Sequence, residues 1–71
     1  MTDPIFLGSL GSRIKELRIK KGLTQNDLAT LCNFEKANMS RIESGKTNIT
    51  ILTLRRISTV LETQIGDFFS K

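Results

Sequence analysis

Two basic side chains, Lys36 and Arg41, stand little more than one helical turn apart in the stretch Leu23–Gly45. Arginine can donate two hydrogen bonds to the O6 and N7 atoms of guanine, and lysine can reach the same atoms less specifically. Both residues fall off the apolar stripe formed by Met39 and Ile42, so they share the open face of a helix. The pattern therefore predicts two short helices joined by a turn, the second with a basic face that fits the major groove of DNA.

A first helix, expected to open near Asp3-Pro4, supports that unit. Asp is a good N-cap and Pro is favoured at the first helical position. Gly8 and Gly11 weaken the first turn, so the helix could start as late as Ser9. Gly22 ends the helix after two lysines, which suit the negative end of the helix dipole. The apolar stripe of this helix is formed by Leu7, Leu10, Ile14 and Leu17.

The second and third helices make up the central unit. Thr24 fits the N-cap of the second helix, with Asp27 reaching back to its amide in a capping box. Asn33 is predicted to occupy the turn in the left-handed conformation, because asparagine tolerates that conformation better than other non-glycine residues. Phe34 is expected to pack inward, and Gly45 ends the third helix. The inward-facing residues are predicted to be Leu28, Ala29, Cys32, Met39 and Ile42.

A fourth helix with Thr50 as its N-cap and a short fifth helix complete the predicted fold. Arg55 and Arg56 lie off the apolar stripe, where they could steer DNA or form an ordinary solvated face. No segment alternates strictly between apolar and polar residues over a useful length, so strands are not expected. The Thr- and Ile-rich stretch 47–60 is the place where a strand would compete with the predicted helix. The expectation is an all-α, compact five-helix bundle, a single domain over residues 1–71. Its last two helices carry Ile51, Leu54, Ile57, Leu61, Ile65, Phe68 and Phe69.

Length and composition limit what can stabilise and what can bind this chain. A chain of 71 residues buries only about 60% of the surface that its unfolded form exposes. One cysteine and no histidine exclude an intrachain disulfide and an ordinary zinc cluster. Regular helix packing and dimerisation remain as the means of stabilising so small a domain. A net charge of +4 favours nucleic acid or an anionic surface as partner, against the alternative of basic residues kept for solubility.

Several classes of function find no support in the residues. Ile5–Leu7 is the longest apolar run, too short to span a bilayer, and no secretory signal is visible. Without histidine the common general base is missing, and the carboxylates are dispersed with no glycine-rich phosphate loop. Cys32 is read as a small core residue rather than a redox sensor, and a lone cysteine suits a reducing cytosol. We expect a cytoplasmic, non-enzymatic protein with no cofactor, membrane contact or small-molecule effector site.

The order and spacing of several short motifs resemble the phage-repressor (Xre, lambda/Cro-like) helix-turn-helix family over about residues 9–69. The chain also resembles small restriction–modification controller proteins. The resemblance implies five packed helices, the second and third forming the DNA-binding unit. The motifs that carry it are Arg13–Arg18, Gly22–Gln25, Asp27–Ala29, Met39–Glu43, Gly45-Lys46 and Leu61–Phe69.

The resemblance also implies roles for individual residues. Arg18 and Glu43 are expected to form a structural ion pair that joins the first helix to the end of the third. Asn38 lies beside the base-reading positions and could reach a phosphate or a base. Base edges are expected to meet Lys36, Ala37, Ser40 and Arg41, whereas the DNA backbone is expected to meet Gln25, Ser44, Lys46, Thr47 and Asn48.

Some residues depart from the family pattern. Glu35 stands where Ser or Thr commonly caps the third helix. Its carboxylate suits the helix dipole but would face DNA phosphates; alternatively it accepts a hydrogen bond from a cytosine amino group, which makes it a candidate base contact. Asn33 replaces the usual turn glycine and Ile49 a common proline. The last helix is expected to be looser than usual, because its pattern differs at Glu62, Gln64 and Gly66.

A single domain of this kind reads few bases, so we expect a homodimer on a pseudo-palindromic operator, with half-site centres about 34–36 Å apart. The function expected is sequence-specific binding of double-stranded DNA by a transcriptional regulator. The alternative is an antitoxin or helper protein that uses the same fold mainly to bind another protein. The candidate dimer contacts, which could equally be ordinary packing of the last two helices, are Ile49, Leu52, Phe68 and Phe69.

Overall fold

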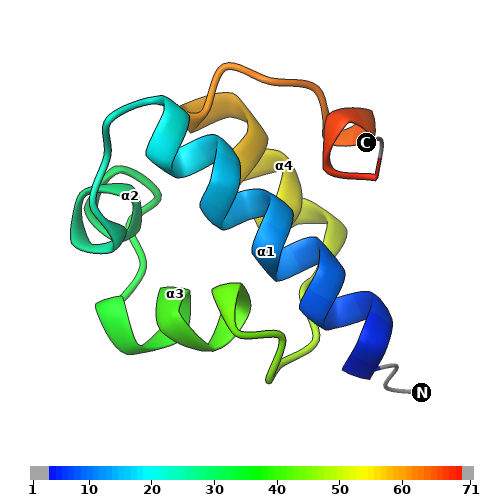
Figure 1. The fold of residues 1–71 in the computed structure, drawn as a ribbon. Coiled ribbons are helices and arrows are strands. Elements are labelled where there is room, and N and C mark those ends of the chain that lie inside the picture. The colour runs from blue at the N-terminus through cyan, green and yellow to red at the C-terminus, as the bar shows by residue number, and fades with distance from the viewer. Residues whose placement is uncertain (1–3, 70–71) are drawn as a thin grey trace.

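Four α-helices and one 3-10 turn form the part of the chain described by this computed structural model, residues 4–69 (Figure 1). No strand occurs in these residues, and the all-α prediction is confirmed. None of the helices among them combines the length and the apolar character that a bilayer span requires. The elements are α1 (Pro4–Lys20), α2 (Gln25–Leu31), α3 (Lys36–Glu43), α4 (Ile51–Val60) and the 3-10 turn η1 (Ile65–Phe68).

The predicted fifth helix is present only as the short turn η1, so a count of five α-helices is not confirmed. The turn is closed by the Asp67 carboxylate, which accepts from the Thr63 hydroxyl at 2.6 Å and the Gln64 amide at 3.1 Å. These bonds lower the pKa of Asp67, the Thr63 hydroxyl most strongly. Gly66 disfavours a regular helix, and the hydrogen bonds of Asp67 close a single 3-10 turn instead. This turn places the Phe68 side chain in the core.

The helices are arranged so that α2 and α3 share one side of the molecule (Figure 1). In this view α1 crosses the front diagonally, α4 lies behind it, and η1 lies on the side away from α2 and α3. Contacts join α3 to both α1 and α2, whereas α4 meets α2 and η1. The pair α2–α3 is therefore backed by both of the longer helices and open on its other side.

Side-chain caps fix where α2 and α4 begin. The Thr24 hydroxyl accepts from the Asp27 amide at 3.0 Å, and the Asp27 carboxylate accepts from the Thr24 amide at 2.9 Å. This capping box was predicted and is confirmed; the Thr24 amide is the main cause that lowers the pKa of Asp27. Thr50 caps α4 as predicted by accepting from the Thr53 amide at 3.1 Å. Local sequence thus sets these boundaries independently of the core.

All four α-helices end in the same way, with one residue in the left-handed conformation followed by an amide that donates back to the helix. After α3, for example, the Lys46 amide donates to the Arg41 carbonyl at 2.9 Å. The prediction for Asn33 is confirmed. A glutamate in this conformation was not expected. The four residues and their φ angles are Gly22 (74°), Asn33 (60°), Gly45 (73°) and Glu62 (55°).

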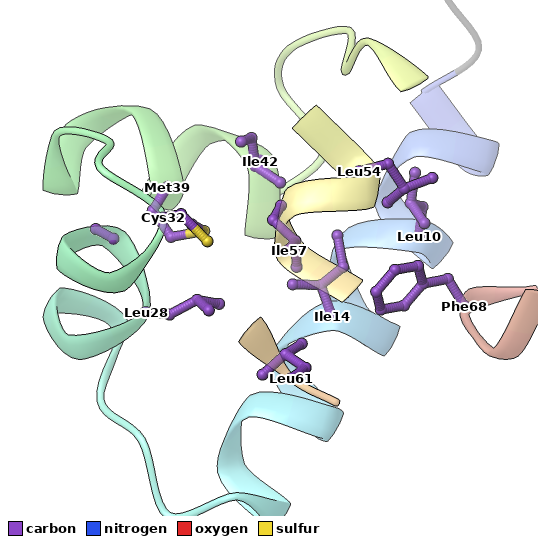
Figure 2. Close-up of a cluster of buried hydrophobic side chains, with 11 residues drawn as sticks. Leu10, Ile14, Leu28, Cys32, Met39, Ile42, Leu54, Ile57, Leu61 and Phe68 are labelled. Atoms are coloured by element: carbon purple, nitrogen blue, oxygen red, sulfur yellow. The ribbon is translucent and has the colours of Figure 1, made fainter. Parts of the chain in front are cut away.

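A single buried cluster draws side chains from every helical element (Figure 2). The five inward-facing residues predicted for α2 and α3 are all buried, and Phe34 packs against the cluster. Ile51 shares the predicted helical spacing of Leu54, Ile57 and Leu61, but as the first residue of α4 it is 67% exposed, and Leu54 is the first residue of that helix to reach the core. The cluster consists of Leu10, Ile14, Leu28, Ala29, Cys32, Met39, Ile42, Leu54, Ile57, Leu61 and Phe68.

At Gly11, α1 and α3 approach each other closely. A Cβ atom at this position would lie 2.5 Å from the carbonyl oxygens of Ile42 and Glu43. Because both obstacles are backbone atoms, only glycine allows the two helices to sit this close. The glycines do not delay α1, which is helical from Pro4; the predicted N-cap Asp3 lies outside the described residues.

Candidate nucleic-acid interface

The two faces of α3 separate as its sequence pattern predicts. Met39, Ile42 and Glu43 are buried against the rest of the molecule. The side chains expected to read bases lie on the opposite face, and Asn38 beside them is half-buried. The exposed residues of this reading face are Lys36, Ala37, Ser40 and Arg41.

Glu35 occupies the N-cap of α3 but does not cap it. Its backbone is extended, as an N-cap requires, yet its side chain makes no hydrogen bond to the helix amides. The carboxylate is exposed and stands one residue before Lys36. Its charge suits the positive end of the helix dipole. The amides in the first turn of α3 therefore donate no hydrogen bond to the Glu35 side chain.

Gln25, the predicted phosphate contact, is tied to α3. It is the first residue of α2, and its Nε2 atom donates to Glu43 Oε1 at 3.2 Å. The side chain is half-buried. A glutamine amide carries two N–H donors and a carbonyl acceptor, so this bond uses one donor and orients the others.

The predicted ion pair between Arg18 and Glu43 is present. Arg18 Nε donates to Glu43 Oε2 at 2.7 Å, and Arg18 Nη2 donates to Oε1 at 3.0 Å. Both side chains are largely buried, with 10% and 3% exposed. Arg18 Nη1 also donates to the Leu23 carbonyl at 2.9 Å. One guanidinium thus connects α1, the segment that leads into α2, and the end of α3, and Gln25 shares the same carboxylate.

The loop after α3 presents Lys46 and Asn48 to solvent, with Thr47 half-buried between them. The Thr47 hydroxyl donates to the Asn48 carbonyl at 3.3 Å. Ser44 directs its hydroxyl back to the Ser40 carbonyl at 2.7 Å. A phosphate needs a donor, so Ser44 must release that carbonyl before its side chain can bind one. Lys46 is the residue of this loop that is best placed by charge and exposure for a backbone contact.

Arg56 is a residue whose role the sequence did not decide. Its guanidinium donates to the Cys32 carbonyl at the end of α2 and lies 5.8 Å from the centroid of the Phe34 ring. Burial raises the pKa of the Cys32 thiol, and the nearby charge of Arg56 opposes that effect only in part. Cys32 is fully buried in the core, as predicted. The sequence did contain one indication of this contact. The last turn of α2 has no basic residue, so a cation that binds its terminal carbonyls has to come from another element.

The residues expected at a dimer interface do not share one environment. Leu52 is 72% exposed and Phe69 is 52% exposed, whereas Ile49 is half-buried and packs on the core. Phe68 is only 3% exposed, so ordinary core packing, the alternative reading, accounts for it. The Phe69 ring stacks on Phe6 with centroids 5.8 Å apart. The correction follows from η1, which turns Phe68 inward and its neighbour outward.

Comparison with known proteins decides the family. The HTH_3 family, described as helix-turn-helix, matches residues 14–68. The chain belongs to this family. The control protein C.MunI of Mycoplasma sp is 33% identical over 61 residues, which make up 84% of this chain and 82% of that protein.

Solved structures of restriction–modification controller proteins agree with the fold. The restriction–modification controller protein C.AhdI from Aeromonas hydrophila superimposes with a TM-score of 0.88 at 29% identity, over 92% of this chain and 98% of its own. The wild-type controller protein C.Esp1396I gives a TM-score of 0.84 at 36% identity, over 94% and 86% of the two chains. The protein is a helix-turn-helix DNA-binding regulator close to restriction–modification controller proteins.

Proposed function

We propose that this protein is a controller-type transcriptional regulator that binds a pseudo-palindromic operator as a cytoplasmic homodimer, with α3 in the major groove. The observation that carries the proposal is the exposed face of α3, where Lys36 and Arg41 flank Ala37 and Ser40 on a helix whose other face is buried. A helix inserted in this way reads base edges with its exposed side chains.

The side chains divide by chemistry into base readers and backbone binders. Arg41 and Lys36 can donate to guanine, Ala37 can meet a thymine methyl group, and Glu35 can accept from cytosine. Phosphate contacts set register and affinity but carry no sequence information directly. We assign Glu35, Lys36, Ala37, Ser40 and Arg41 to bases, and Gln25, Asn38, Ser44, Lys46, Thr47 and Asn48 to the backbone.

The dimer is supported by apolar side chains that the single chain leaves exposed. Ile51 and Leu52 form the exposed first turn of α4, and Phe69 follows η1. Burial of such side chains stabilises a small domain whose own core is limited. We therefore place Leu52, Phe69 and Ile51 in the interface with the half-buried Ile49 at its edge, and leave Phe68 in the core.

The decisive test is enrichment of bound sequences from a randomised duplex pool at several salt concentrations. We expect a two-fold symmetric motif, with the binding constant falling steeply as salt rises because phosphate contacts release counterions. Enrichment of no motif, with affinity no better than that of a generic basic protein, would exclude sequence-specific regulation.

The dimer has its own test by sedimentation. Leu52→Glu should shift the protein to monomer and weaken operator binding more than binding to random DNA. Ile19→Glu is the matched control, since Ile19 is 58% exposed on α1 but outside the proposed interface. Equal behaviour of the two variants would place the interface elsewhere.

Two substitutions test the division of contacts. Arg41→Ala should lose about 1–3 kcal/mol of discrimination at one base position, because a bidentate contact to guanine is lost. Lys46→Ala should weaken binding to all sequences alike and reduce the salt slope by about 1. The measurement is the binding constant for the enriched site and for its single-base variants. Identical profiles for the two variants would contradict the assignment.

A further inference from the structure

The turn between α2 and α3, residues 32–35, joins the end of α2 to the start of α3 (Figure 1). Its first half is ordered by Asn33 in the left-handed conformation and by the Phe34 amide, which donates to the Ala29 carbonyl at 2.8 Å. Both features belong to α2 and the turn that ends it. They do not connect the turn to the body of the protein.

The turn meets the body of the protein through the buried Cys32 side chain and the Phe34 ring, and Arg56 adds a polar contact from α4. Its Nη1 atom donates to the carbonyl of Cys32, the C-cap of α2, at 3.3 Å. The last carbonyls of a helix lack partners within the helix and carry its negative dipole end, so a cation there is favourable. No residue in the last turn of α2 is basic, and α4 supplies the charge instead.

The same guanidinium lies against the Phe34 ring, 5.8 Å from its centroid, next to the carbonyl that it binds. Phe34 is half-buried and its ring packs on the core cluster. The fixed fork of a guanidinium can donate to the carbonyl through one nitrogen while its charge stays over the ring, whereas the ammonium of lysine is a single point charge on a flexible stem. The contact therefore depends on arginine rather than on charge alone.

The first turn of α3 depends on this turn for its position. Glu35 gives it no side-chain cap, while the last residue, Glu43, is fixed by the buried pair with Arg18. The proposed base readers Lys36 and Ala37 lie at the less constrained end. Lys36 and Ala37 directly follow the turn, so they are the proposed base readers closest to any change in it.

We propose that Arg56 is a positioning residue for specific DNA recognition: by bracing the Cys32 carbonyl and the Phe34 ring, it fixes the angle at which the first turn of α3 meets the bases. The proposal rests on the function proposed above. It makes Arg56 act through the turn rather than through a phosphate, although its charge would suit either role.

The test compares Arg56→Lys with Arg55→Lys, a matched change at the neighbouring exposed arginine. Binding to the enriched operator and to random duplex is measured at a temperature where circular dichroism shows every variant fully folded. We expect Arg56→Lys to lower operator affinity about tenfold, as when one base contact is weakened, and to leave random-duplex affinity unchanged. Arg55→Lys should match the wild type on both duplexes.

Salt titration of Arg56→Gln separates positioning from direct contact. A positioning residue leaves the slope of the logarithm of the binding constant against the logarithm of salt at its wild-type value, whereas loss of a phosphate contact lowers it by about 0.9. Should Arg56→Lys fail to fold, Phe34→Leu removes the ring while keeping an apolar side chain, and the same selective loss of operator affinity is expected.

Two results overturn the proposal: an operator-to-random ratio for Arg56→Lys within twofold of the wild type, or a slope for Arg56→Gln that falls by a full phosphate contact. Failure of the wild type to enrich any motif would instead reject the proposed function. The two failures are therefore distinguishable in one set of measurements.

Discussion

The two ends of α3 are held in different ways. At its C-terminal end, Glu43 is paired with Arg18, Gly45 closes the helix, and the backbone lies against Gly11 of α1. At its N-terminal end, Glu35 provides no side-chain cap and Lys36 is exposed. The buried end fixes where the helix sits, and the open end keeps side chains available for a partner. The difference shows which substitutions should act on folding and which on recognition.

The largest effect is expected where α1 meets the C-terminal end of α3. Gly11→Ala places a methyl group 2.5 Å from two backbone oxygens, and overpacking of this kind costs about 3 kcal/mol. Gly8→Ala is the control on the same helix, since nothing lies within 4 Å of its Cβ position. Alanine there should stabilise the helix by up to about 1 kcal/mol. Urea unfolding measures the change in the free energy of unfolding for both variants. Changes of the same sign would contradict the close approach of α1 and α3 at Gly11.

The buried pair comes next. Glu43→Gln leaves the Arg18 guanidinium without its carboxylate, at a cost of about 2 kcal/mol, less than for a fully unpaired buried charge because the glutamine carbonyl can still accept a hydrogen bond. The double variant Arg18→Met with Glu43→Leu removes both charges and should be less destabilised than Arg18→Met alone or Glu43→Leu alone. Thermal unfolding with a double-mutant cycle checks this. Additive losses would mean that the pair does not act as a unit.

A change at the open end should be smaller and should stabilise. Glu35→Thr supplies the missing cap of α3, worth about 1 kcal/mol in stability. It also removes a negative charge beside Lys36, so affinity for random duplex should rise. Glu35→Gln is the control, because it removes the charge without adding a good cap. A loss of preference for one base pair in both variants would identify Glu35 as a cytosine contact.

The smallest effect is a pH dependence of stability. Hydrogen bonds lower the pKa of Asp27 and of Asp67 below the ordinary carboxyl range. A lowered pKa in the folded state contributes stability that is complete above the ordinary pKa and is lost as pH falls through the folded value. The melting temperature should therefore drop as pH falls through the ordinary carboxyl range and below it. Asp27→Asn should flatten part of that fall, and an unchanged profile would contradict a role for the capping box.

Local signals in the sequence predicted much of the fold. The capping box at Thr24, the left-handed Asn33 and the stripe around Met39 depend on neighbours in the chain, so a pattern of a few residues suffices to predict them. The pair of Arg18 with Glu43 was predicted from family resemblance, since its partners lie far apart in sequence.

The features that the sequence missed depend on contacts between distant segments. Gly11 was read as a weak point because its neighbours on α3 cannot be inferred from α1 alone. Phe68 and Phe69 are adjacent and alike, and only the geometry of η1 decides which is buried. Arg56 reaches residues 22 and 24 positions earlier, a pairing that no helical period indicates. The exposed face of α3 was predicted from the spacing of its apolar residues, but the contacts of Arg56 with Cys32 and Phe34 were not.

The shortness of α3 has a consequence for how its activity can be lost. An isolated helix of fewer than about 12–15 residues is marginal in water, and α3 has eight. A peptide of this sequence would be largely unstructured, so the reading surface exists only while α1 and α2 hold it. Amides on its buried face should exchange with solvent only when the whole protein opens, and substitutions far from α3 should remove this surface once they lower global stability enough to unfold the chain.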